Sequence, residues 1–159
     1  MSEFEAAESP RSLVRPQLVS VFEIWTEIAA GRVAPTREEI DPRKLRGLLP
    51  WTWMADVIDE GRDIRFRVAG ERIVEFVGRR YTGEHLSAHE HRPFFARVKR
   101  LFSHCIATRK PVVLGPTRSI MEGREYLQLE ILALPLSQDG ESITGLFGAM
   151  EVWPAAAVP

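Results

Sequence analysis

Three histidines that lie close together in the sequence form its best candidate for a metal site. His85 and His89 stand four residues apart, so on a helix they would share one face, and His91 follows two residues later. The segment is short and polar, however, and it has neither a cysteine ligand nor the His-Glu-x-x-His order of zinc enzymes. We therefore interpret it as an exposed connector and expect no metal.

The same segment is the one place where the sequence suggests acid–base chemistry. Glu90 stands beside His89, and with His85 these side chains could serve a small α+β enzyme, which we keep as the least favoured alternative. The sequence has no phosphate-binding loop, dinucleotide fingerprint, nucleophile elbow or supported pair of carboxylates. We therefore predict no catalytic residue and a protein that is not an enzyme.

A run of basic side chains invites a nucleic-acid interpretation. Its members are Arg79, Arg80, Arg92, Arg97, Lys99 and Arg100. The whole chain carries 21 Lys and Arg against 22 Asp and Glu, a formal net charge of −1. A nucleic-acid-binding domain normally has a clear basic excess, so a solvated face is the better interpretation and no nucleic acid is expected as a partner.

Length and composition indicate one globular domain. The chain has 159 residues, of which 45% are hydrophobic and 27% charged, enough to bury a core. Its single Cys105 excludes an intramolecular disulfide. No apolar run reaches the roughly 18 residues that a membrane span needs, and the acidic N-terminus does not resemble a signal peptide. We expect a cytoplasmic protein without a membrane partner.

The first predicted element is an amphipathic helix over residues 16–31. It follows a predicted flexible tail, 1–15, and it opens a single domain, 16–153, with a second tail at 154–159; Pro16 suits its first position. Its apolar face is unusually broad and comprises Leu18, Val21, Phe22, Trp25 and Ile28. Such a face needs more cover than one edge of a small domain usually gives. The helix packs either wholly on its own sheet or also against a second subunit, and we favour the second, a homodimer.

Two starts for a short helix compete in the segment 31–50. Thr36 and Glu39 match a capping box, but Pro42 disfavours helical backbone at Asp41, so a helix from Thr36 would stop within a turn. Asp41 as N-cap, followed by Pro42, is the better start.

Strands follow. Trp53 and Ala55 alternate with polar or mixed neighbours, as do Ile64 and Phe66, and a turn at 59–63 joins the two runs into a hairpin. A helix from Pro93 comes next, and then three strands at 112–120, 127–136 and 143–152. The first of the three should be irregular at residues 115–116, because proline cannot donate to a ladder. Antiparallel strands with helices grouped between them indicate an α+β domain.

This order of elements resembles that of the PAS domain. The matching residues are Trp25, Ile40, Asp41, Pro42, Leu45, Leu49, Pro50, Phe66, Arg67, Gly70, Gly78, Tyr81, Thr82 and Gly83. The chain is similar, over about residues 24–153, to the stand-alone bacterial PAS family that is common in alphaproteobacteria. The resemblance implies a five-stranded antiparallel sheet with helices on one face and a small cavity between them. It also implies a non-enzymatic sensory or regulatory module that acts through contacts with a signalling protein.

The PAS resemblance suggests two cofactors, neither of which we expect. His104 lies in the helix that carries the iron ligand of haem-binding PAS proteins, and Cys105 invites comparison with flavin photoreceptors, whose sequence pattern is missing here. A lone helical histidine is more often a hydrogen-bonding group, and a free cysteine more often a packed hydrophobe. A cofactor-bearing sensor remains the alternative function.

The preferred prediction is a small apolar ligand, or none, in a cavity between sheet and helices. The candidate lining residues are Trp53, Phe66, Phe76, Phe102, Leu129 and Phe147. Plain core packing is the competing interpretation of these six.

Overall fold

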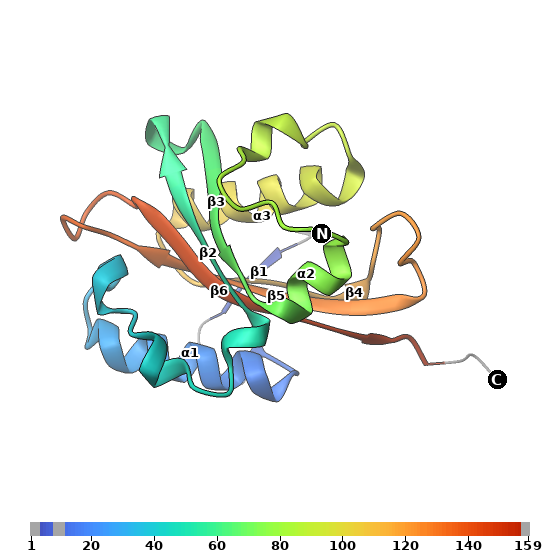
Figure 1. Ribbon diagram of the computed structural model, residues 1–159. Coiled ribbons are helices and arrows are strands. Elements are labelled where there is room, and N and C mark those ends of the chain that lie inside the picture. Colours follow the sequence, from blue (N-terminus) through green and yellow to red (C-terminus); the bar gives the residue numbers. More distant parts are fainter. Residues whose placement is uncertain (1–3, 8–11, 157–159) are drawn as a thin grey trace.

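The computed structural model describes residues 4–7 and 12–156 (Figure 1). Its helices and strands are β1 (Phe4–Ala6), α1 (Pro16–Ala29), β2 (Thr52–Ile58), β3 (Asp63–Ala69), α2 (Glu71–Val77), α3 (Pro93–Thr108), β4 (Val112–Arg118), β5 (Leu127–Leu136) and β6 (Gly145–Pro154). Short 3₁₀ turns connect several of them, among them Arg37–Glu39, Pro42–Leu45 and Leu49–Trp51. The predicted α+β class is confirmed. None of the helices in the described part combines the length and apolar character that crossing a membrane requires.

The strands form one antiparallel sheet in the order β1-β4-β5-β6-β2-β3. The sheet has six strands, so the predicted count of five was wrong by one. The added strand is β1, in which Phe4 pairs with Leu114 of β4. Three residues are too few to show an alternating pattern, so the sequence did not indicate this strand. It forms because the edge of β4 is available for pairing. The irregularity predicted at 115–116 is present, because the β4–β5 ladder shifts register between Leu114 and Thr117.

Both predicted tails are partly built into the fold. Besides β1, the backbone N–H groups of Val14 and Arg15 donate to the carboxylate of Glu130 in β5, at 2.9–3.2 Å. At the other end β6 continues to Pro154. The remaining positions of the tails, 1–3, 8–11 and 157–159, lie outside the described residues.

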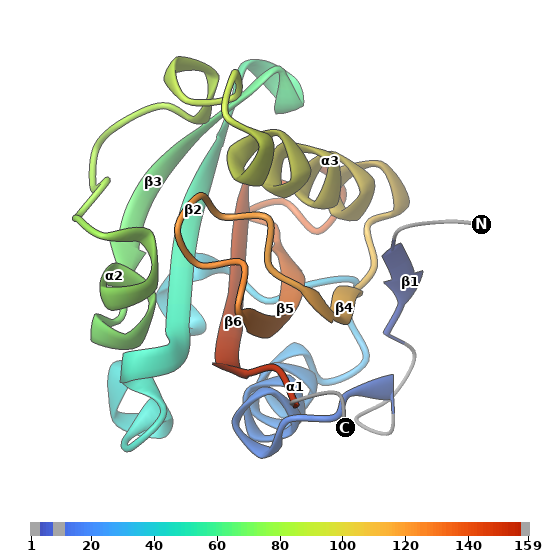
Figure 2. The ribbon, with the colours of Figure 1, turned by 90° about the vertical axis from the view of Figure 1, so that its right-hand side faces the viewer.

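Helices cover both faces of the sheet (Figure 2), whereas the PAS resemblance implied helices on one face; the N-terminal helix α1 covers the second. α2 and α3 pack on one face, where Leu129 and Ile131 of β5 point toward them. α1 packs on the other face, against Leu132 and Leu134 of the same strand. All residues of β5 from Leu129 onward are buried, because each of them meets a helical layer.

The broad apolar face of α1 is filled by the chain itself. Leu18, Val21, Phe22 and Trp25 are buried against the sheet, and Ile28 is partly buried in the same cluster. The indole N–H of Trp25 donates to the carbonyl oxygen of Pro135 at 3.0 Å. These are the residues that motivated a homodimer through this helix. Since their apolar surface is already covered, its breadth no longer argues for a second subunit, and the homodimer stays a prediction without this support.

Both competing short-helix starts are realised as single 3₁₀ turns. The Thr36 side chain accepts from the N–H of Glu39, whose carboxylate accepts from the N–H of Thr36, a complete capping box. Asp41 then accepts from the N–H of Arg43 at 2.9 Å, with Pro42 at the first position of the next turn. Pro42 limits the first turn, as expected, and the second turn begins at the capping residue Asp41.

Candidate ligand cavity

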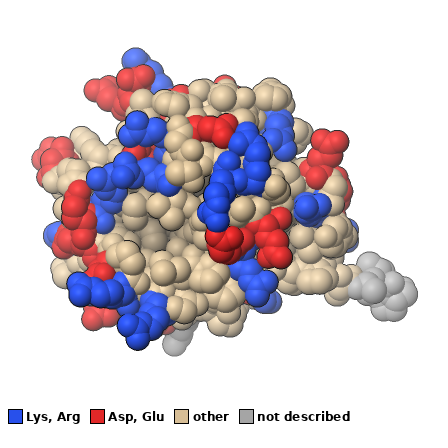
Figure 3. All heavy atoms as spheres, in the orientation of Figure 1, with Lys and Arg blue, Asp and Glu red and all other residues tan. Residues whose placement is uncertain are grey.

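A small apolar cavity lies between the β2–β3 half of the sheet and the helices α2 and α3. Its volume is about 90 Å³, and it is open to one side, where Figure 3 shows a hollow surrounded mainly by uncharged atoms. The lining includes Trp53, Phe66, Ile73, Phe95 and Met150. An apolar cavity of about 150 Å³ can hold benzene, so this smaller cavity suits at most one ring, part of which would lie toward the opening.

A stacked pair of aromatic rings forms the floor. Trp53 of β2 lies on Phe102 of α3, with ring centroids 4.7 Å apart and an interplanar angle of 25°. Gly148, the partner of Trp53 in β6, makes this position possible: a Cβ there would stand 2.7 Å from the indole ring. A β-strand residue with a side chain at position 148 would displace the indole.

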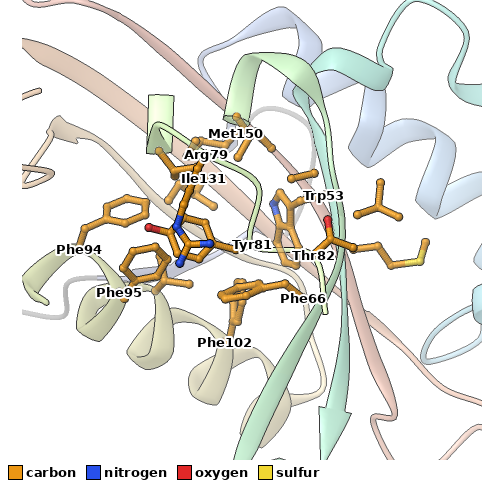
Figure 4. A pocket seen from close by; sticks show the side chains of 16 residues that line it. Trp53, Phe66, Arg79, Tyr81, Thr82, Phe94, Phe95, Phe102, Ile131 and Met150 are labelled. Carbon is orange, nitrogen blue, oxygen red and sulfur yellow. The ribbon is translucent and has the colours of Figure 1, made fainter. Parts of the chain in front are cut away.

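Four further rings form the wall next to α3 (Figure 4). Phe95 lies 5.0 Å from Tyr81, 6.3 Å from Phe66 and 5.3 Å from Phe94, measured between ring centroids. The rings meet mostly edge to face, the arrangement that the aromatic quadrupole favours. Such a wall offers polarizable surface to an apolar or aromatic ligand.

The segment 79–85 closes one side of the cavity by pairing with the outer edge of β3. The N–H of Gly83 donates to the carbonyl oxygen of Phe66 at 2.7 Å, and the N–H of Phe66 donates to that of Glu84 at 3.0 Å. Arg79 lies over the Tyr81 ring, 3.8 Å from its centroid, and its two terminal nitrogens donate to the Glu84 carboxylate at 2.6 and 3.1 Å. Arg79 is therefore the charged side chain at the mouth of an otherwise apolar site.

Two carboxylates hold this segment in place. The hydrogen bonds from Arg79 and then His89 lower the pKa of Glu84 to about 2. Burial acts to raise the pKa of Asp63, but hydrogen bonds from Ser87, from the N–H of Ile64 and from His85 outweigh it and lower this pKa to about 2. Both carboxylates are ionised at neutral pH, when they bind the segment most strongly.

The structure distributes the six predicted cavity residues over four environments. Trp53, Phe66 and Phe102 line the cavity. Leu129 is fully buried in the same core without reaching the cavity surface. Phe76 lies on the far side of α2, where it packs edge to face on Phe94.

Phe147 lies in the layer under α1, on the opposite face of the sheet, so it is not a wall of this cavity. Leu146 and Met150, even-numbered residues of the same strand, face α2 and α3 instead. In the sequence both parities of this strand are apolar, which left its orientation undetermined.

Most of the lining residues were absent from the prediction, among them Tyr81, Phe94, Phe95 and Val98. A signal for two of them existed, because Phe94 and Phe95 directly follow the helix-starting Pro93. Residues in the first turn of a helix that crosses over a sheet often reach the cavity beneath it. Tyr81 stands in a loop, where no periodicity indicates burial.

The histidines pair with carboxylates in separate places. His85 Nδ1 lies 3.0 Å from Asp63, and His89 Nε2 lies 2.8 Å from Glu84. Across residues 4–7 and 12–156, no group of three or more His, Cys, Asp or Glu side chains is arranged to hold a metal ion. These contacts give both histidines a structural position at the segment that closes the cavity.

The two residues considered for cofactors do not line the cavity. His104 lies beside the ring of Phe4, with centroids 6.0 Å apart, next to the β1 edge of the sheet. Cys105 is buried, and its thiol lies within 3.7 Å of the carbonyl oxygen of Ala133; burial raises the pKa of the thiol. His104 therefore does not provide this cavity with an axial ligand for a haem, and Cys105 does not provide it with the reactive thiol of a flavin site.

Comparison with known proteins identifies the family. A sequence profile of the PAS domain matches residues 14–151, so this chain belongs to the PAS domain family, whose members are typically sensory and regulatory modules. No curated protein and no solved structure matches the chain significantly.

Proposed function

We propose that this PAS domain is a non-enzymatic sensory module that binds a small apolar molecule in the cavity between α3 and the β2–β3 hairpin. The observation that carries the proposal is the cavity itself, a space of about 90 Å³ whose floor and wall are aromatic rings. The expected ligand is one aromatic ring or a body of similar size, because burial of apolar surface is the main interaction that the lining offers. Binding would reach a second protein through contacts at the surface.

The segment 79–85 supports this proposal because it can vary the access to the cavity. It contributes Tyr81 and Thr82 to the lining, and it is attached to β3 by two backbone hydrogen bonds and to its surroundings by the ion pair of Arg79 and Glu84. A surface ion pair contributes at most about 1 kcal/mol, so the two backbone hydrogen bonds and the burial of Tyr81 contribute most of what keeps this side closed. A ligand that packs on Tyr81 would stabilise the closed arrangement.

Indole serves as the probe because it has no net charge and its benzene ring can enter the cavity while its pyrrole ring lies toward the opening. Its binding is measured by isothermal titration calorimetry, and native mass spectrometry of the freshly purified protein reports any ligand retained from the cell. Val98 lines the cavity from α3, so Val98→Phe should fill the space and abolish indole binding, whereas Val98→Ala should preserve or strengthen it. If Val98→Phe binds indole as tightly as the wild-type protein, the cavity is not the binding site.

A further inference from the structure

A second hollow lies on the other side of α2, between this helix and the ends of β5 and β6. Its volume is about 580 Å³, and its lining includes Trp51, Phe76, Tyr126, Leu127 and Val152. Tyr126 is 60% exposed, an unusual degree for an aromatic side chain in a groove. We call this hollow the α2–β6 groove.

The groove runs along a strand edge that has no partner. The β2–β6 ladder ends at the pair Thr52 and Ala149, but β6 continues beside β5 as far as Pro154. Among the described residues, no strand pairs with this side of β6 beyond Ala149. Unpaired strand edges bind other extended chains unless they are covered.

The alternation of the ladder shows which backbone groups face this edge. The N–H of Ala155 donates to the carbonyl oxygen of Tyr126, a pair that continues the β5–β6 register beyond Leu127 and Pro154. Backbone groups of even-numbered residues of β6 therefore point toward β2, and those of odd-numbered residues toward β5. Beyond the end of β2, Val152 directs its N–H and its carbonyl oxygen into the unpaired edge.

The side chains around this edge define what it can accept. Phe76, Leu127 and Val152 give an apolar floor on the α2 face of the sheet, where every second residue of an added strand would pack. Trp51 stands at one end, with Arg72 over its ring at 5.8 Å. An extended segment with apolar residues at alternate positions fits this floor.

The exposed charges of the groove favour an acidic segment. Three of the four charged side chains of the groove are already paired: Arg72 with Glu75 at 3.8 Å, and the buried Glu151 with Arg15 outside the groove at 2.6 Å. In the described part of the chain the guanidinium of Arg124 has no carboxylate partner, and it contacts only the carbonyl oxygen of Gly123, at 3.4 Å. A carboxylate at the end of a docked strand would complement Arg124.

We propose that the α2–β6 groove docks an extended, acidic segment of a partner protein, which adds a strand beside Val152. This is β-augmentation, in which main-chain hydrogen bonds provide affinity and the side-chain floor provides specificity. The short free edge limits the added strand to a few hydrogen bonds, so the partner dissociates readily, as suits a signalling contact.

The groove and the ligand cavity share two structural elements. Ile73 and Val77 of α2 line the cavity, whereas Arg72, Glu75 and Phe76 of the same helix line the groove. The Met150 side chain borders both. A ligand that moves α2 or Met150 therefore alters the groove, and this coupling, unlike the docking itself, rests on the function proposed above.

A pair of synthetic peptides tests the docking. In Glu-Thr-Val-Thr-Val-Thr-Glu the valines and both glutamates share one face of a strand, and the control peptide has lysine at both ends. Fluorescence anisotropy of the labelled peptides should show binding of the acidic peptide and at least tenfold weaker binding of the lysine peptide. Equal binding of the two peptides, or no binding of either, overturns the proposal.

Two variants and a control assign the site. Val152→Pro removes an N–H that faces an edge to which no described strand pairs, a position where proline is tolerated, and should abolish binding. Arg124→Glu should weaken binding about fivefold or more, even if Val152→Pro does not fold. Arg43→Glu, at an 87% exposed side chain outside the groove, should leave binding unchanged. If Arg124→Glu binds the acidic peptide as tightly as the wild-type protein, the proposal is overturned. It is also overturned if sedimentation shows a protein dimer that Val152→Pro dissociates, since the edge would then bind a second copy of this chain.

Adding saturating indole tests the coupling separately. The peptide Kd should change by at least about fivefold, and the peptide should change the indole Kd by the same factor. Peptide binding without indole binding would refute the ligand proposal and leave the docking site standing. Indole binding without peptide binding would refute the docking site and leave the ligand proposal standing. Binding of both, with neither changing the Kd of the other, would refute the coupling.

Discussion

Replacing Gly148 by alanine should cost more stability than any other single methyl group added to the sheet. A Cβ at this position would stand 1.9 Å from the carbonyl oxygen of Leu132 in β5, as well as 2.7 Å from the indole of Trp53. The first of these contacts is with backbone in the middle of the β5–β6 ladder, which cannot move without breaking hydrogen bonds on both strands. The second displaces Trp53 from its stack on Phe102.

The magnitude follows from these contacts. Overpacking in a close-packed core costs about 1–3 kcal/mol. Distortion of one or two ladder hydrogen bonds adds about 1 kcal/mol each, and loss of the ring stack adds roughly 0.5–1.5 kcal/mol. A loss of about 3–5 kcal/mol in the free energy of unfolding is expected, a large part of the roughly 5–15 kcal/mol typical of a domain.

Gly145→Ala in the same strand is the matched control. Its Cβ would stand 3.4 Å from the carbonyl oxygen of Ala55 and 3.5 Å from Leu136, ordinary or nearly ordinary contact distances. Urea denaturation followed by circular dichroism measures the free energy of unfolding of both variants. Gly148→Ala should lose about 3–5 kcal/mol, whereas Gly145→Ala should stay within about 1 kcal/mol of the wild type. Equal stability of the two variants would refute the packing described here for Trp53 and the central ladder.

Two further predictions concern buried and ion-paired carboxylates. Glu130→Gln should lower the free energy of unfolding by about 1–3 kcal/mol, because the amide offers one oxygen to the two N–H groups of Val14 and Arg15 and leaves its own NH₂ without an acceptor. The exposed Glu122→Gln serves as the control. A loss of stability no larger than that of the control would contradict this role of Glu130. The lowered pKa values of Asp63 and Glu84 predict stability that is fully present above pH 4.5 and is lost as the pH falls toward 2, because the folded state then has to bind protons that the unfolded state binds more readily. Denaturation midpoints between pH 6 and 2 measure this loss, which should become shallower in Asp63→Asn and would speak against these contacts if it stayed the same.

Local chemistry was sufficient to predict most of the elements. The alternation of Ile64 and Phe66 with arginines, and Pro42 after the capping residue Asp41, depend on interactions within a few residues, and each produces the predicted element. The strand 127–136 has its predicted bounds. The order of these elements was enough to suggest the PAS family, which the profile match confirms.

The cavity was only partly predictable. Trp53 and Phe66 belong to strands with one clearly apolar face, so their direction followed from the alternation. In β6 both parities are apolar, because this central strand meets α1 on one face and α2 and α3 on the other. Nothing in such a strand indicates that Phe147 faces α1 while Met150 faces the cavity.

The sequence by itself determined the class of fold, the positions of the long strands and helices, and the absence of a recognisable catalytic motif, since all of these depend on short-range patterns of residues. The tertiary structure decided which apolar residues share a layer. It placed the broad apolar face of α1 on the chain's own sheet. It also made Phe4–Ala6 an edge strand, and among the described residues it left one edge of β6 beyond Ala149 unpaired beside α2. These outcomes depend on which surfaces of distant segments remain uncovered once the sheet has formed, a quantity that no local pattern contains.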